Sequence, residues 1–175
     1  MPQTYAGFDE RPFDSHYLYT DTVIDYPIDV VWPRAINIPA WMHDHVRYES
    51  VSGSPGEVGN LLRVLLRDPG ELPPPQYTLT GIAHIIPFKL ITFEVFPEKG
   101  GSYGGEVFPS DYRGFDTFLF TDLGERTKVA FFVVSTSESK IAIPKSDEAR
   151  VAAVQKHFDN LRELIASEIE VRAGS

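Results

Sequence analysis

The segment at residues 22–41, TVIDYPIDVVWPRAINIPAW, constrains the fold of this chain more than any other segment. Val23, Ile24 and Tyr26 favour a strand, because branched and aromatic side chains pack well on a pleated surface. Pro27 ends that strand because it cannot donate a hydrogen bond to a neighbouring strand. The segment therefore begins as a strand that stops abruptly.

Two short helices are predicted directly after this strand, reaching to about residue 45. Asp29 can cap the first helix by accepting a hydrogen bond from a free amide of the first turn. Pro33 is compatible with this helix only in its first turn, where amides have no helical partner. Pro39 then forces a second break. A strand followed at once by two short helices is unusual, so this order narrows the set of compatible folds.

Seven strands are predicted before one long helix, the first of them at residues 17–26. Leu62 and Val64 alternate with Arg63 and Arg67, which is the period of a half-buried antiparallel strand. A long glycine-rich loop is expected to precede the last two strands, and it is interpreted either as a flap over a binding site or as an ordinary exposed loop. This loop spans residues 97–114, and the remaining strands are expected at 46–52, 60–67, 77–86, 88–96, 115–123 and 127–136.

The last predicted element is a helix at residues 146–172. Ser146 or Asp147 can cap it, and Asp147 and Glu148 suit the positive end of its dipole. Apolar residues recur at spacings of three and four, which predicts one apolar stripe that must lie across a sheet or a partner. The stripe consists of Val151, Val154, Phe158, Leu161, Ile165 and Ile169. The pattern predicts an α+β chain whose antiparallel sheet folds around this helix.

The composition excludes several classes of function. The formal net charge is −9, which argues against binding to nucleic acid and to anionic membrane surfaces, since both need a positive surface. The chain has no cysteine, so disulfides, zinc–thiolate sites and thiol catalysis are excluded. We expect no cofactor, no metal site and no stable membrane insertion.

The N-terminus has no basic region followed by an apolar run, so no secretory signal is predicted there. No window approaches the roughly 18 apolar residues that span a membrane. We therefore expect a cytoplasmic protein with an N-terminal tail at 1–16, a single domain at 17–172 and a C-terminal tail at 173–175.

Residues 24–32, IDYPIDVVW, resemble the first strand–helix junction of the START-like (SRPBCC) superfamily, where Ile-Asp, Pro and then Val-Trp recur. Trp41 and the glycines of the turn at 53–59 also stand where this superfamily usually has them. Pro33, directly after Trp32, departs from the pattern. The resemblance covers nearly the whole chain, and it implies a helix-grip fold: a curved seven-stranded antiparallel sheet wrapped around a long C-terminal helix, with two short helices after the first strand.

This superfamily includes Bet v 1-type proteins and polyketide cyclase/dehydrase proteins, and no catalytic motif is shared across it. The resemblance implies an apolar cavity between the sheet and the C-terminal helix, binding a small hydrophobic or aromatic molecule such as a lipid, polyketide or quinone. One alternative is a cyclase/dehydratase-type enzyme that acts on such a ligand by acid–base catalysis. A second is a regulator of the co-chaperone type that binds a protein partner. The oligomeric state stays open between monomer and homodimer.

Three titratable residues are weak candidates for catalysis. His84 lies in an apolar strand and shares a face with Ile82 and Ile86 if the strand alternates regularly. His157 borders the apolar stripe of the long helix. Glu94 lies inside a strand, where an inward orientation would raise its pKa. Each also has a structural interpretation: a hydrogen-bonded or outward histidine, an interface histidine, and a solvent-facing carboxylate.

The triplet His43-Asp44-His45 is interpreted as the polar end of the second short helix, or as an acid–base group at a pocket mouth; metal binding is the third reading. Aromatic residues are abundant, at 13% of the chain, and they suit either a core or the wall of a pocket for a flat ligand. The residues predicted to bind the ligand are Trp41, His45, Tyr77, His84, Phe118, Phe120, Phe131, His157, Phe158 and Leu161.

Overall fold

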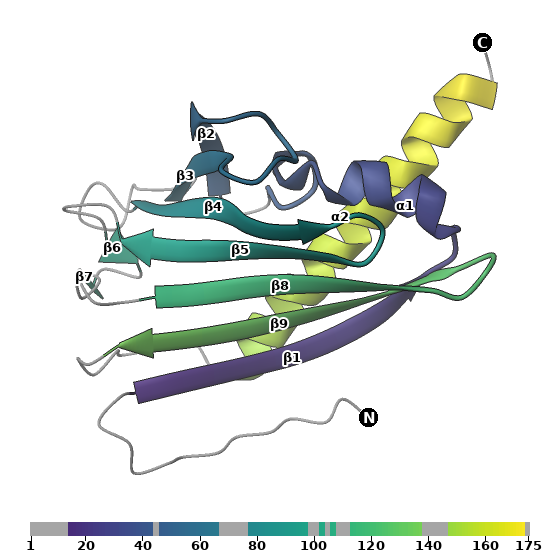
Figure 1. Cartoon of the computed structure of the whole chain (residues 1–175). Helices are drawn as coiled ribbons and strands as arrows, with labels where there is room; N and C mark the ends of the chain where they lie inside the picture. The colour runs from purple at the N-terminus through teal and green to yellow at the C-terminus, as the bar shows by residue number, and fades with distance from the viewer. Residues whose placement is uncertain are drawn as a thin grey trace.

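A seven-stranded antiparallel sheet and one long helix dominate the computed structural model (Figure 1). The structure describes residues 14–43, 46–66, 77–97, 102–103, 106–107, 113–137 and 147–173. The sheet has the strand order β1-β9-β8-β5-β4-β3-β2. Its strands are β1 (Asp14–Ile24), β2 (Val46–Ser52), β3 (Leu61–Leu66), β4 (Tyr77–Ile86), β5 (Leu90–Pro97), β8 (Arg113–Asp122) and β9 (Thr127–Ser137).

The other elements cover one face of this sheet or extend beyond it. A helix α1 (Ile28–Ala35) and a 3-10 helix η1 (Ile38–Ala40) follow β1, and α2 (Asp147–Ala173) crosses the strands obliquely behind the sheet (Figure 1). A small hairpin, β6 (Ser102–Tyr103) and β7 (Glu106–Val107), lies within the predicted long loop. The predicted seven-stranded antiparallel sheet around a C-terminal helix is confirmed. None of the described helices is long and apolar enough to cross a membrane.

The start of α1 differs from the predicted one. Pro27 is the N-cap residue, and no side chain caps the helix. Asp29 lies in the first turn, where its charge suits the helix dipole. Pro33 lies inside the helix beyond its first turn, although proline was predicted to be compatible with this helix only in the first turn. Both Asp29 and Pro33 are exposed, so water can reach the side of the helix where the proline removes a backbone donor.

Strand β5 begins later than predicted because Phe88 occupies a turn. Its φ is 61°, in the left-handed region, and the Lys89 amide donates to the Ile86 carbonyl at 3.0 Å. The Phe88 ring is half-exposed and lies 5.7 Å from the Trp32 ring. This aromatic contact holds the turn against α1.

Phe118 is the centre of the core between the sheet and the helices. Its ring lies 4.7 Å from Phe131 on β9, 5.4 Å from Trp41 after η1, 6.3 Å from Phe93 on β5 and 6.5 Å from Phe158 on α2. The stripe of α2 is buried as expected at Val154, Phe158, Leu161 and Ile165, whereas Val151 is half-buried and Ile169 is exposed. One aromatic cluster therefore joins four parts of the chain.

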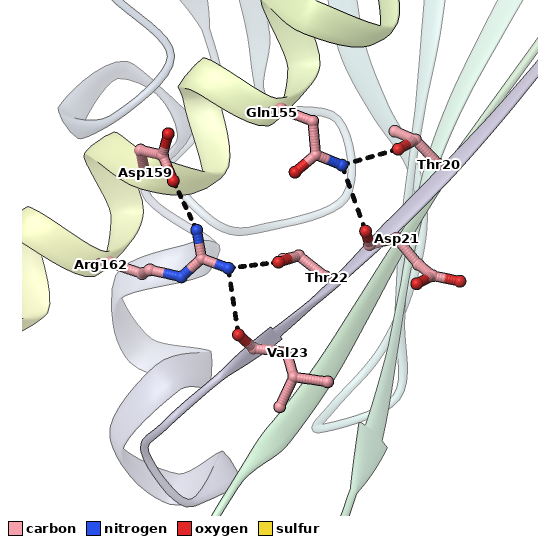
Figure 2. A network of polar contacts seen from close by, with 7 residues as sticks. All are labelled: Thr20, Asp21, Thr22, Val23, Gln155, Asp159 and Arg162. Atoms are coloured by element: carbon pink, nitrogen blue, oxygen red, sulfur yellow. Dashed lines mark hydrogen bonds and ion pairs between the residues drawn. The ribbon is translucent and has the colours of Figure 1, made fainter. Parts of the chain in front are cut away.

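Polar side chains of α2 cover the free edge of β1 (Figure 2). The Gln155 amide donates to Thr20 Oγ1 at 2.7 Å and to the Asp21 carbonyl at 3.2 Å. Arg162 donates to Thr22 Oγ1 and, at 3.0 Å, to the Val23 carbonyl. These donors occupy backbone carbonyls that an edge strand otherwise leaves unpaired.

Candidate functional site

A pocket of about 200 Å³ opens between η1, the turn joining β2 to β3, and the inner face of the sheet. Its walls are mostly apolar, with a few polar groups from the tyrosine, the serine and the two asparagines. Pockets of this composition are typical of small-molecule sites. The lining residues are Ile36, Asn37, Ile38, Pro39, Tyr48, Ser50, Pro55, Gly56, Asn60, Leu62, Ile82 and Phe93.

The turn at residues 53–60 forms one side of this pocket. Gly56 has a φ of 77°, and a Cβ atom there would lie 3.3 Å from Ile36 Cδ1, so glycine lets the turn approach α1 closely. The Gly59 amide donates to the Ile82 carbonyl, and the Ile82 amide donates to the Asn60 carbonyl, both at 3.0 Å. These bonds tie the turn to β4 and hold the pocket wall in place.

Tyr48 is the phenol that lines this pocket. It lies opposite Val64 in the β2–β3 register, on the face that carries Leu62. Burial of its hydroxyl raises the pKa of Tyr48 far above its ordinary value, and the negative charge of Asp116 raises it further. The phenol therefore stays neutral at physiological pH and can donate or accept a hydrogen bond.

Six of the predicted ligand-binding residues belong to the core. They are buried and form part of one cluster, and they are not among the residues that line the 200 Å³ pocket. The Trp41 indole donates to the Ala35 carbonyl at 3.2 Å, and the Asn160 amide donates to the Trp41 carbonyl at 2.9 Å. The six are Trp41, Phe118, Phe120, Phe131, Phe158 and Leu161.

His84 lies on the outer face of the sheet, against the regular alternation assumed for its strand. The β4–β5 register shifts between Ile82 and His84. This irregularity keeps Ile82 opposite buried Phe93 but pairs His84 with Thr92. His84 is exposed, which agrees with the outward-facing interpretation and not with a face shared with Ile82.

Glu94 also faces outward, where its carboxylate lies 3.9 Å from the Arg113 guanidinium. His157 is half-buried on α2, and its Nδ1 atom is buried. His43 is half-buried after η1, whereas Asp44 and His45 lie outside the described residues. Tyr77 begins β4, but its side chain and most of the predicted 97–114 loop are outside the described part of the structure.

Within the described ranges, no group of three or more histidine, aspartate or glutamate side chains could hold a metal ion. Tyr48, Asn60 and Phe93 line the pocket although the sequence did not identify them as ligand-binding residues. The alternation of Tyr48 and Ser50 on β2 with Arg47 and Glu49 was the available signal, because it marks the inward face of that strand.

No protein-family model matches the chain, and no curated protein matches its sequence. Solved structures are similar to it in fold. The crystal structure of Ara h 8.0201 is 14% identical in sequence to this chain and has a TM-score of 0.65. The match covers 88% of this chain and 99% of the Ara h 8.0201 chain. A protein of unknown function from Staphylococcus aureus is 10% identical in sequence and has a TM-score of 0.64. The match covers 90% of this chain and 98% of the Staphylococcus aureus chain.

Norcoclaurine synthase from Thalictrum flavum, in complex with dopamine and hydroxybenzaldehyde, is 12% identical to this chain. The match covers 95% of this chain and 98% of the synthase chain, with a TM-score of 0.64. These likenesses agree with the observed sheet order and with the position of α2 across the sheet. The chain thus has the helix-grip fold that these solved structures share.

Proposed function

We propose that this protein binds a small apolar or aromatic molecule in the pocket between η1, the β2–β3 turn and the sheet. The observation that carries the proposal is the pocket itself, whose walls come from the α1–η1 region and from strands β2 to β5. Apolar walls with a few convergent polar groups are the usual chemistry of such sites.

The size of the pocket supports a compact ligand. Its volume of about 200 Å³ is below the range of roughly 300–1,000 Å³ that is typical for drug-sized ligands. A single substituted aromatic ring suits this volume better than a long acyl chain. The related fold that holds dopamine and hydroxybenzaldehyde supports a ligand of that size.

Binding is better supported than acid–base catalysis on the ligand. An enzyme of the cyclase/dehydratase kind needs titratable side chains that point into the cavity. His84 and Glu94, the two strand residues proposed for that role, both face outward. The remaining candidate, His157, is not among the residues that line the pocket.

Native mass spectrometry of the freshly purified protein, together with calorimetric titration of propylbenzene, tests this proposal. We expect a co-purifying small molecule, and binding of propylbenzene once that molecule is removed. Ser50→Phe should weaken propylbenzene binding by about tenfold or more, because the added ring fills the pocket that Ser50 lines.

Val51→Phe is the matched control, since Val51 is the next residue along β2, is exposed and does not line the pocket. It should bind propylbenzene as the wild type does. Equal affinity in the Ser50→Phe variant, or no binding by the wild type, would contradict the proposal.

A further inference from the structure

The described residues that line the pocket are all uncharged. They include no aspartate, glutamate, lysine, arginine or histidine. Their polar side chains are the Tyr48 phenol, the Ser50 hydroxyl and the amides of Asn37 and Asn60. Burial of an ammonium or carboxylate group is costly unless an opposite charge compensates it. The lining therefore favours a ligand whose polar group is neutral.

The Tyr48 hydroxyl is a polar group of the pocket that can still form hydrogen bonds. Tyr48 packs against the buried core and lines the pocket, and its hydroxyl has no hydrogen-bond partner among the described residues. Since burial holds the pKa of this phenol far above its ordinary value, the group is a neutral O–H that both donates and accepts. Buried polar groups are usually paired, so a ligand with a neutral polar group at Tyr48 gains a hydrogen bond that a hydrocarbon cannot form.

Asn60 adds an acceptor to the same pocket. Its side chain is held in place, because Nδ2 donates to the Ser52 carbonyl at 3.3 Å. That bond leaves Oδ1, which has no partner among the described residues, as the atom available to a ligand. A hydroxyl suits both Tyr48 and Asn60 because it donates and accepts, whereas a carboxylate can only accept.

We propose that the pocket selects a small uncharged aromatic molecule that carries a hydroxyl, with Tyr48 as the hydrogen-bond partner of that hydroxyl, over an amine or a carboxylate of similar size. The inference rests on the function proposed above and adds the chemical class of the ligand. A charged ligand would either bury its charge among neutral groups or keep the charge in water and leave Tyr48 unpaired. Both alternatives lower affinity relative to the alcohol.

Four probes that differ in one terminal group test the selectivity by calorimetric titration at neutral pH: 2-phenylethanol, propylbenzene, phenethylamine and phenylacetate. We expect 2-phenylethanol to bind about tenfold more tightly than either charged probe. Tyr48→Phe should lower the affinity for 2-phenylethanol about fivefold and leave the affinity for propylbenzene within about twofold of the wild type, which also shows that the variant is folded. Tyr17→Phe is the control, because it removes a phenol hydroxyl from an exposed residue outside the pocket. It should bind all the probes as the wild type does.

The outcomes separate the two proposals. If propylbenzene binds but 2-phenylethanol shows no preference over the charged probes, the selectivity proposal is wrong and the binding function stands. The same holds if Tyr48→Phe keeps the wild-type affinity for 2-phenylethanol. The order of the probes on the wild type decides the question if Tyr48→Phe does not fold. If none of the probes binds the wild type, the binding function fails and the selectivity fails with it.

Discussion

Gly53 occupies a crowded backbone position in the turn that joins β2 to β3. Its φ is 78°, and a Cβ atom there would lie 2.7 Å from both Asn60 Cα and the Gly59 carbonyl oxygen. Those atoms belong to the backbone of the same turn and cannot rotate away. The turn that forms one side of the pocket therefore needs glycine at residue 53 for two reasons. The backbone there is left-handed, and there is no space for a Cβ atom.

Gly53→Ala should lower the free energy of unfolding more than Gly59→Ala does. Gly59 has a φ of 87° but no heavy atom within 4 Å of an added Cβ, so its substitution costs only the left-handed conformation, about 1–2 kcal/mol. Gly53→Ala adds a steric clash, and we expect roughly twice that loss. Urea unfolding of both variants measures the difference, and equal losses would show that the turn relaxes without cost.

Side chains of α2 cover the free edge of strand β1 with hydrogen bonds. β1 is an edge strand, and the Asp21 and Val23 carbonyls on its free side accept hydrogen bonds from Gln155 and Arg162 (Figure 2). An uncovered edge is a template for pairing with a second chain. Arg162 also contacts Asp159 at 2.5 Å, which holds the guanidinium in position over the strand.

Arg162→Met should destabilise the protein by about 1–3 kcal/mol, because charge-assisted hydrogen bonds are lost. It should also increase self-association, because the β1 edge is less well covered. Chemical unfolding and sedimentation velocity measure the two effects. Glu163→Met, at the next and exposed position of α2, is the control and should change neither. A monomeric Arg162→Met variant with wild-type stability would show that the cover on β1 is dispensable.

At the scale of the whole molecule, one aromatic cluster joins the sheet to the helices. Phe118 contacts rings from β5, β9, α2 and the residue after η1. It is 2% exposed, so its side chain fills space that no neighbour can occupy without moving. The pocket lies beside this cluster, and Phe93 belongs to both. The core therefore fixes the position of one pocket wall.

Phe118→Ala should lower the free energy of unfolding by about 3–5 kcal/mol, the usual loss for removing a buried aromatic ring. Phe115→Ala, on the same strand but 41% exposed, should cost less than about 1 kcal/mol. Thermal and urea unfolding of both variants test the difference. Similar losses in the two variants would mean that the core does not depend on Phe118.

Much of the fold was predictable because its signals are local. The alternation in β3 and the stripe of α2 depend on residues a few positions apart, and burial confirms them at Leu62, Phe158 and Ile165. The position of Pro33 inside α1 was not predictable, because helix propensity alone excludes a proline there. The proline is tolerated because it lies on the exposed side of the helix. The start of β5 moved from the predicted residue 88 to Leu90, because Phe88 occupies a turn.

The candidate site was less predictable, because it depends on pairing between distant strands. The irregularity after Ile82 turned His84 outward, and no local pattern marks that shift. Most of the aromatic residues expected around a ligand pack on one another instead. Abundance of aromatic residues indicates apolar surface, but it cannot distinguish a filled core from the wall of a pocket.

The amino-acid sequence by itself determined the order and type of the main elements, because hydrophobic periodicity is encoded within each element. The helix-grip arrangement was implied by the resemblance at residues 24–32. Only the tertiary structure decided which side chains meet in the pocket. Tyr48, Ile82 and Phe93 come from three different strands. The faces they share follow from register between strands, and register is set by pairing across the whole sheet.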